Sequence, residues 1–149
     1  MVVRLFSQEW AAAWRREINA SAGFRERGSD WRGSLVLVID PQGDGSGEEA
    51  VFVELHEGKC TRARRATAGD RRRADLVIRA RQRTWQDLFA GHADLLLSIM
   101  LGRFSLERGS LDELRPHLGA ARELLRTAGK VDTGDRAGGD PAPSGDADA

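Results

Sequence analysis

The sequence has little that would hold the protein together covalently or anchor it in a membrane. It contains a single cysteine, Cys60, among 149 residues, so no disulfide can form within the chain. No stretch reaches the roughly 18 apolar residues that a membrane-spanning helix needs. The N-terminal segment MVVRLFSQEW also lacks the long apolar region of a secretory signal. We therefore expect a reduced, cytoplasmic protein that folds around an ordinary hydrophobic core.

The chain also lacks net charge, because 23 Lys and Arg residues balance 23 Asp and Glu residues. Only Lys59 and Lys130 are lysines, and many of the arginines gather in one region: Arg62, Arg64, Arg65, Arg71, Arg72, Arg73, Arg79, Arg81 and Arg83. Such a cluster suits phosphate or anionic lipid, but it also suits the solvated face of a sheet, and the zero net charge favours that reading. We expect no nucleic-acid partner. Transient contact of the Arg62–Arg83 region with an anionic membrane stays open.

Motifs for catalysis and for metal binding are missing as well. His56, His92 and His117 do not have the spacing of metal ligands, and Cys60 has no obvious base beside it in the sequence. The segment GDGSG at Gly43–Gly47 resembles a phosphate-binding loop. Such a loop needs a helix after it, and here a strand is expected, so a hairpin loop is the better interpretation. We therefore expect a non-catalytic protein with no cofactor and no bound metal.

The first half of the chain predicts one helix and three strands. Ser7 is a suitable N-cap, and Trp10, Trp14 and Ile18 follow it four residues apart on one helix face, which predicts a helix over residues 7–20. A strand is expected over residues 31–40. Residues 50–66 are expected to form a hairpin that turns near residues 57–58.

The second half alternates strands with short helices. Strands are expected over residues 74–81 and 103–108, and a short helix is expected to open at Thr84, with Asp87 completing its capping box. Near the end of the chain we expect a turn from Leu111 and a helix that restarts at Pro116. Residues 129–149 are rich in Gly, Asp, Ala and Pro. This composition predicts a folded domain over residues 1–128 and a disordered tail over 129–149.

One helix stands out because it has no polar side. From Leu95 to Leu101 the sequence LLLSIML places six large apolar residues around Ser98, between a capping Asp94 and the helix-ending Gly102. A helix on the surface of a globular protein normally carries polar residues on its outer side. This helix is therefore either sandwiched in the core between sheet and last helix, or it faces a cavity that holds an apolar ligand. Periodicity alone does not separate the two.

The order of these elements resembles the sterol carrier protein 2-like domains. The segment ADLVIRARQRTWQDLFAGHADLLLSIMLGRFSLERGSL is similar to their C-terminal half, in which an Ala-Asp strand, a short helix and an apolar helix lead into a Gly-basic-apolar-x-apolar strand. Gly91, Gly102, Arg103, Phe104 and Leu106 occupy the matching positions. The leading helix, the WRGSLVLVID strand and VFVELHEGKC extend the resemblance over roughly residues 6–125.

This resemblance implies an α+β fold: a five-stranded, mostly antiparallel sheet covered by helices, with an apolar tunnel between them. It implies a stand-alone domain of bacterial type that binds, and transfers or presents, a sterol, fatty acid or acyl-CoA. The alternative is an interaction or dimerisation module, with a homodimer as one partner, that serves an enzyme of lipid metabolism without exchanging free ligand. The candidate wall residues share an apolar side chain in the apolar helix or the elements around it: Trp85, Leu88, Phe89, Leu95, Leu96, Ile99, Met100, Phe104, Leu106, Leu118 and Leu125.

Overall fold

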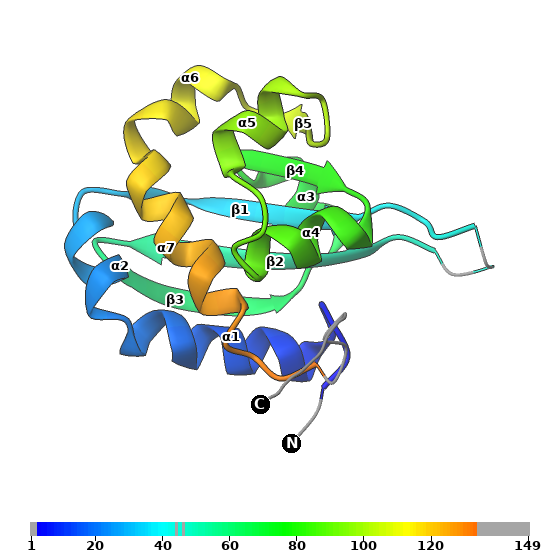
Figure 1. The fold of residues 1–149 in the computed structure, drawn as a ribbon. Helices are drawn as coiled ribbons and strands as arrows, with labels where there is room; N and C mark the ends of the chain where they lie inside the picture. The colour runs from blue at the N-terminus through cyan, green and yellow to red at the C-terminus, as the bar shows by residue number, and fades with distance from the viewer. Residues whose placement is uncertain (1–2, 44, 46, 134–149) are drawn as a thin grey trace.

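The computed structural model describes residues 3–43, 45 and 47–133, and it shows one sheet of five strands (Figure 1). The strand order is β3-β2-β1-β4-β5, in which β1 and β4 run parallel and all other neighbours run antiparallel. The strands are β1 (Arg32–Ile39), β2 (Glu49–His56), β3 (Lys59–Arg65), β4 (Leu76–Ala80) and β5 (Ser105–Arg108). The expected α+β fold with a five-stranded, mostly antiparallel sheet is confirmed.

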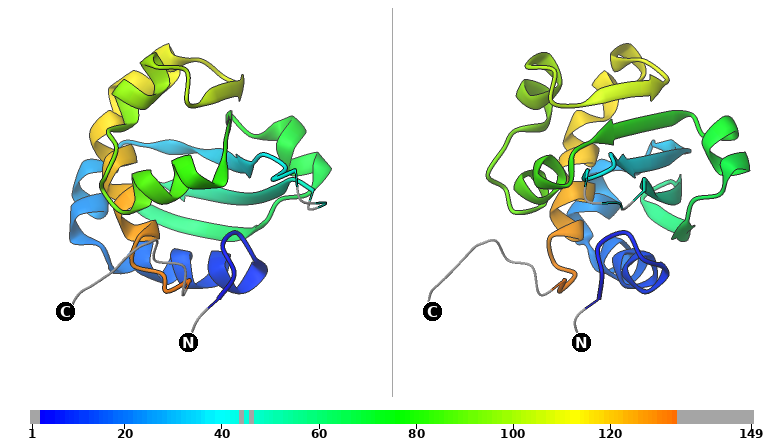
Figure 2. Two further views of the ribbon diagram at one scale, coloured as in Figure 1. Left: turned by 45° about the vertical axis from the view of Figure 1, so that its right-hand side comes forward. Right: turned by 90° about the vertical axis from the view of Figure 1, so that its right-hand side faces the viewer.

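The helices cover the two faces of the sheet unequally (Figure 2). They are α1 (Gln8–Ala20), α2 (Ala22–Arg27), α3 (Ala68–Arg73), α4 (Gln82–Phe89), α5 (Leu95–Met100), α6 (Leu111–Leu114) and α7 (Leu118–Ala128), with a 3₁₀ turn at Arg115–His117. The main core lies between the sheet and the layer formed by α1, α2, α4 and α7. A smaller apolar cluster, under α3, fills the opposite face.

Alternation along β1 explains how one strand serves both clusters. Leu35, Leu37 and Ile39 belong to the main core, whereas Val36 and Val38 point to the other face, and all five are buried. The second part of this central strand, from Leu35 to Ile39, is therefore apolar on both faces. The antiparallel pairing of β1 with β2 makes the two strands a hairpin, as expected, whereas a phosphate loop would lead into a helix; Asp44 and Ser46 lie outside the described residues.

The predicted first helix is confirmed, but a second helix follows it that the sequence analysis missed. The Ser7 side chain accepts a hydrogen bond from the Trp10 amide, and Trp10, Trp14 and Ile18 are fully buried. Ser21 then ends α1 and caps α2 by accepting from the Phe24 amide. A helix of six residues has too little periodicity to be separated from a loop by pattern alone.

The arginines at residues 71–73 do not lie on the face of the sheet, the setting that was favoured for the arginine cluster. They form the last turn of α3, which begins with a complete capping box between Thr67 and Asp70. Asp70 also pairs with Arg64 at 2.7 Å between the guanidinium Nη2 and the carboxylate. Although burial opposes ionisation, the hydrogen bonds from Arg64 and Thr67 prevail and lower the pKa of Asp70. This local cap is what turns a polar, arginine-rich stretch into a helix.

Two helix starts differ from the prediction. Helix α4 begins at Gln82, with Arg81 as its N-cap and no side-chain cap, so the expected capping box at Thr84 and Asp87 is wrong. Helix α7 begins at Leu118, since Pro116 lies within the preceding 3₁₀ turn. The capping box of Ser110 with Glu113 is present and opens α6.

The ordered chain continues past residue 128, where we placed the domain boundary. Val131 is only 9% exposed and packs in the main core, and the Val3 amide donates to the Asp132 carbonyl oxygen at 3.0 Å. The first residues of the supposed tail therefore close the core beside the N-terminus. The rest of the supposed tail, residues 134–149, lies outside the described residues.

A truncation pair tests this corrected boundary. The free energy of unfolding should be about 2 kcal/mol lower for a chain that ends at Ala128 than for a chain that ends at Thr133. The shorter chain loses the burial of Val131 and the backbone contacts beside it. Urea unfolding of both chains measures the difference. Equal stability of the two chains would return the boundary to residue 128.

Candidate functional site

The apolar helix α5 exposes one of its faces to solvent. Leu95 and Ser98 are buried, whereas Leu97, Met100 and the adjoining Leu101 are 54%, 71% and 58% exposed. These are the large apolar residues that stand out as exposed in the described part of the chain. The three positions follow the i, i+3, i+4 spacing of one helix face. Helix α5 is therefore a core helix on one side only, and its other side is an apolar patch.

Helix α5 is also held loosely in the fold. It makes few backbone contacts with any other helix or strand. As expected, the Asp94 carboxylate caps it by accepting from the Leu97 amide, and Gly102 ends it with a φ of +75°. A side-chain ion pair at 3.3 Å between Asp94 and Arg122 links its start to α7. An element with so few packed contacts is expected to open at a low free-energy cost.

Aromatic side chains form the core beside α5. Trp85 lies 4.9 Å from Phe104 and 5.9 Å from Phe89 between ring centroids, and its indole nitrogen donates to the Val38 carbonyl oxygen at 2.8 Å. Phe89 in turn stacks on Trp10 at 5.9 Å. The rings thus make a continuous apolar surface from α1 through α4 to the start of β5.

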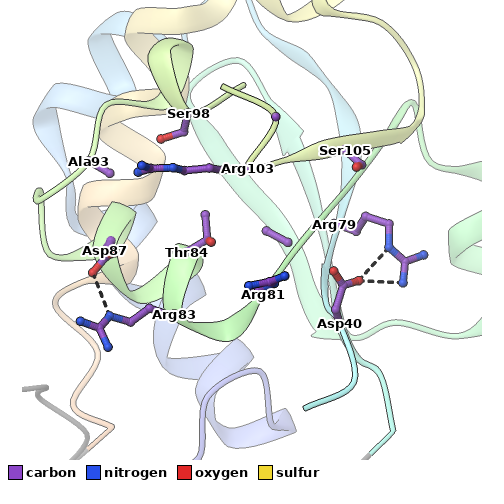
Figure 3. Close-up of a pocket in the computed structure, with 12 residues that line it drawn as sticks. Asp40, Arg79, Arg81, Arg83, Thr84, Asp87, Ala93, Ser98, Arg103 and Ser105 are labelled. Carbon is purple, nitrogen blue, oxygen red and sulfur yellow. Dashed lines mark hydrogen bonds and ion pairs between the residues drawn. The ribbon is translucent and has the colours of Figure 1, made fainter. Parts of the chain in front are cut away.

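A polar pocket of about 610 Å³ opens between the start of α4, the end of α5 and the strands β4 and β5 (Figure 3). Four arginines line it, and two of them are engaged: Arg79 pairs with Asp40 at 2.7 Å and Arg83 with Asp87 at 3.6 Å. The other two cations that line this pocket are Arg81 and Arg103; both are exposed, and neither forms an ion pair within the described residues. The pocket therefore offers two uncommitted guanidinium groups.

Most other arginines of the Arg62–Arg83 region are neutralised by carboxylates. Arg71 and Arg79 bridge Glu48 and Glu107, and the hydrogen bonds from Arg71 lower the pKa of both glutamates. Arg62, Arg64 and Arg65 pair with Glu54, Asp70 and Glu49, respectively. This agrees with a solvated, ion-paired face. It leaves Arg72 and Arg73 of α3, together with Arg81, without an ion pair in the described part of the chain.

The structure brings nine of the eleven predicted wall residues into or against the core. Trp85, Leu88, Leu95, Phe104 and Leu125 are buried in it, and Phe89, Ile99, Leu106 and Leu118 are partly buried against it. Leu96 is half-buried. Met100 is placed differently, since its side chain faces solvent on the apolar patch.

The sequence analysis missed the pocket residues Ser98, Arg81 and Arg103 as a group. The signal is the antiparallel register of β4 and β5, which pairs Arg79 with Ser105. Continued by two residues, that register places Arg81 opposite Arg103. Since the two arginines are far apart in sequence, only the strand pairing reveals that they line one pocket.

Two features of the described residues bear on catalysis and metal binding: the buried thiol, and the distribution of His, Cys, Asp and Glu side chains. Burial raises the pKa of the Cys60 thiol to about 11, which makes it a poor nucleophile at neutral pH. Residues 3–43, 45 and 47–133 hold no group of three or more His, Cys, Asp and Glu side chains that could bind a metal ion. Across the same residues, no helix is both long and apolar enough to cross a bilayer.

Comparison with solved structures identifies clear relatives. The chain is 34% identical to a crystal structure of sterol carrier protein 2, covering 86% of this chain and 99% of that one, with a TM-score of 0.78. It is also 34% identical to a conserved hypothetical protein from Thermus thermophilus, described as a candidate sterol carrier protein, covering 91% of this chain and 94% of that one, again with a TM-score of 0.78. Sterol carrier protein 2 from Yarrowia lipolytica shares the fold at 15% identity, with coverage of 87% and 97% and a TM-score of 0.58. No protein-family model and no curated protein sequence matches the chain.

Proposed function

Because this chain belongs to the sterol carrier protein 2 family, we propose that it is a non-catalytic carrier that binds an apolar lipid chain along α5, next to the aromatic core. The family and its fold suggest lipid binding or transfer in general terms. The finer proposal concerns where the lipid chain lies on the protein and which helix moves to admit it.

The observation that carries this proposal is the exposed apolar face of α5. Leu97, Met100 and Leu101 are in water although the same helix buries Leu95 against the core. Contiguous exposed apolar surface commonly marks a ligand or partner site. A lipid chain that lay along α5 would remove this face from water, and each buried methylene group contributes roughly 0.8 kcal/mol.

We further propose that the tunnel implied by the family fold is lined by the apolar residues around α5. The proposed wall consists of Trp85, Leu88, Phe89, Leu95, Leu96, Ile99, Met100, Phe104, Leu106, Leu118 and Leu125. The few backbone contacts of α5 support its role as the element that moves to admit a chain. Met100 can turn onto a lipid with little cost, because its thioether side chain is flexible and its present position is exposed.

The second candidate function is a protein-interaction module, and the same exposed face favours it. A partner chain or a second copy of this protein could cover Leu97, Met100 and Leu101 as a lipid would. Sedimentation at increasing concentration separates the two functions. A carrier stays monomeric at concentrations that saturate it with lipid, whereas an interaction module assembles without lipid.

A chain-length series tests the proposed carrier function. Saturated fatty acids of eight, ten and twelve carbons are titrated below their micelle concentrations, and binding is followed by the fluorescence of the four tryptophans, of which Trp85 belongs to the proposed wall. Affinity should rise about fourfold per added methylene group, since roughly 0.8 kcal/mol is gained for each. Binding that is independent of chain length would contradict an apolar site.

A further inference from the structure

We propose that the pocket between α4, α5 and β5 binds the anionic head group of an amphiphile, a carboxylate or a phosphate, through Arg81, Arg103 and the hydroxyl of Ser98. This inference rests on the proposed lipid-binding function and names the class of ligand: a charged amphiphile and not a neutral sterol. The pocket volume of about 610 Å³ leaves room for such a head group.

The charge of the pocket supports an anion. Arg81 and Arg103 line it without an ion pair in the described part of the chain, and Figure 3 shows the Arg103 side chain extended below Ser98. The carboxylates that face the pocket are already engaged, Asp40 by Arg79 and Asp87 by Arg83. Glu48 and Glu107 lie farther along the Arg79 network and are held by Arg71 as well. An incoming carboxylate would therefore meet two free guanidinium groups.

The N-terminus of α4 adds further positive potential to the pocket. Its N-cap residue is Arg81, whose side chain supplies no acceptor for the first amides of the helix. Arg83 and Thr84, in the first turn, both line the pocket. Free amides and the positive end of the helix dipole stabilise an anion at this position.

Ser98 provides an independent indication of a ligand. The residue is 2% exposed and lines the pocket, and none of the hydrogen bonds in the described part of the chain involves its hydroxyl. A hydroxyl is both a donor and an acceptor, so that of Ser98 is available to donate to a head-group oxygen in the pocket. Figure 3 shows Ser98 beside the side chain of Arg103, on the α5 side of the pocket.

The position of Ser98 also joins the pocket to the apolar site. It lies on α5 between Leu97 and Ile99, so one helix borders both the polar pocket and the proposed lipid wall. An amphiphile could place its head at Arg81 and Arg103 and run its chain along α5. A neutral sterol would leave the two guanidinium groups unused.

The test compares a fatty acid with its neutral ester. Wild-type protein should bind lauric acid at least tenfold more tightly than methyl laurate at neutral pH, as measured by tryptophan fluorescence. In the double variant Arg81→Gln/Arg103→Gln this ratio should fall to about one, with the affinity for the ester unchanged. The matched control is Arg72→Gln/Arg73→Gln, which removes two exposed arginines of α3 and should keep the wild-type ratio.

The outcomes separate the two proposals. If acid and ester bind wild type equally, or if the control loses selectivity as the double variant does, the head-group site is overturned while lipid binding stands. If neither probe binds, the proposed function fails, and titration with inorganic phosphate then decides the anion site. Amide shifts of Arg83 and Thr84 in the NMR spectrum that vanish in the double variant would support a site for free phosphate, and their absence would overturn it.

Discussion

Replacing Trp85 with alanine should lower the free energy of unfolding by about 3–5 kcal/mol, the largest stability effect that we expect from a single substitution. Trp85 is 1% exposed and contacts the rings of Phe6, Phe89 and Phe104. Its removal leaves a cavity in the main core and deprives the Val38 carbonyl of a hydrogen bond. Urea unfolding followed by circular dichroism measures the change.

The control for this prediction is Trp85→Phe, which keeps an aromatic ring and removes the indole N–H group. Its cost should be clearly smaller than that of Trp85→Ala, since most of the packing with Phe104 is retained. A loss below about 1 kcal/mol for the alanine variant would contradict the placement of Trp85 in a well-packed core.

Making the exposed face of α5 polar should weaken lipid binding without weakening the fold. In the triple variant Leu97→Gln/Met100→Gln/Leu101→Gln, the dissociation constant for a long-chain fatty acid should rise at least tenfold, about 1.4 kcal/mol. The three side chains are more than half exposed, so the free energy of unfolding should change by only about 0.5 kcal/mol for each. Fluorescence titration and urea unfolding of the same samples give both values.

A conservative triple variant serves as the control for α5. Leu97→Met/Met100→Leu/Leu101→Met keeps the face apolar and should bind the fatty acid like wild type. Unchanged affinity in the glutamine variant would show that the lipid does not touch this face. If the glutamine variant instead abolished self-association of the protein, the interaction-module function would be favoured.

Elements with a long, one-sided pattern could be predicted from the sequence. The spacing of Trp10, Trp14 and Ile18 and the cap at Ser7 define α1, and the fully apolar run of β1 marks the central strand. Helices α2 and α3 could not be predicted in this way, because each has six residues and exists largely through its cap, Ser21 or Thr67. Local hydrogen bonds decide these short helices, and hydrophobic periodicity carries no trace of them.

The candidate site could be predicted only in its apolar part. The lack of a polar side in α5 pointed to its neighbourhood, but which of its residues face the core depends on the packing of Leu95 and Ser98. The meeting of Arg81 and Arg103 in one pocket depends on the register of β4 and β5, which no local pattern encodes. The burial of Val131 likewise depends on contact between the two ends of the described chain, where the Val3 amide donates a hydrogen bond to the Asp132 carbonyl oxygen.

Native mass spectrometry of freshly purified protein tests the central claim most directly. If the protein is a lipid carrier, its spectrum should show a monomer with one bound lipid, and added fatty acid should displace that lipid at a ratio of one to one. The glutamine variant of α5 should carry less lipid under the same conditions. Protein that is purified bare and stays bare in saturating long-chain fatty acid would contradict the account.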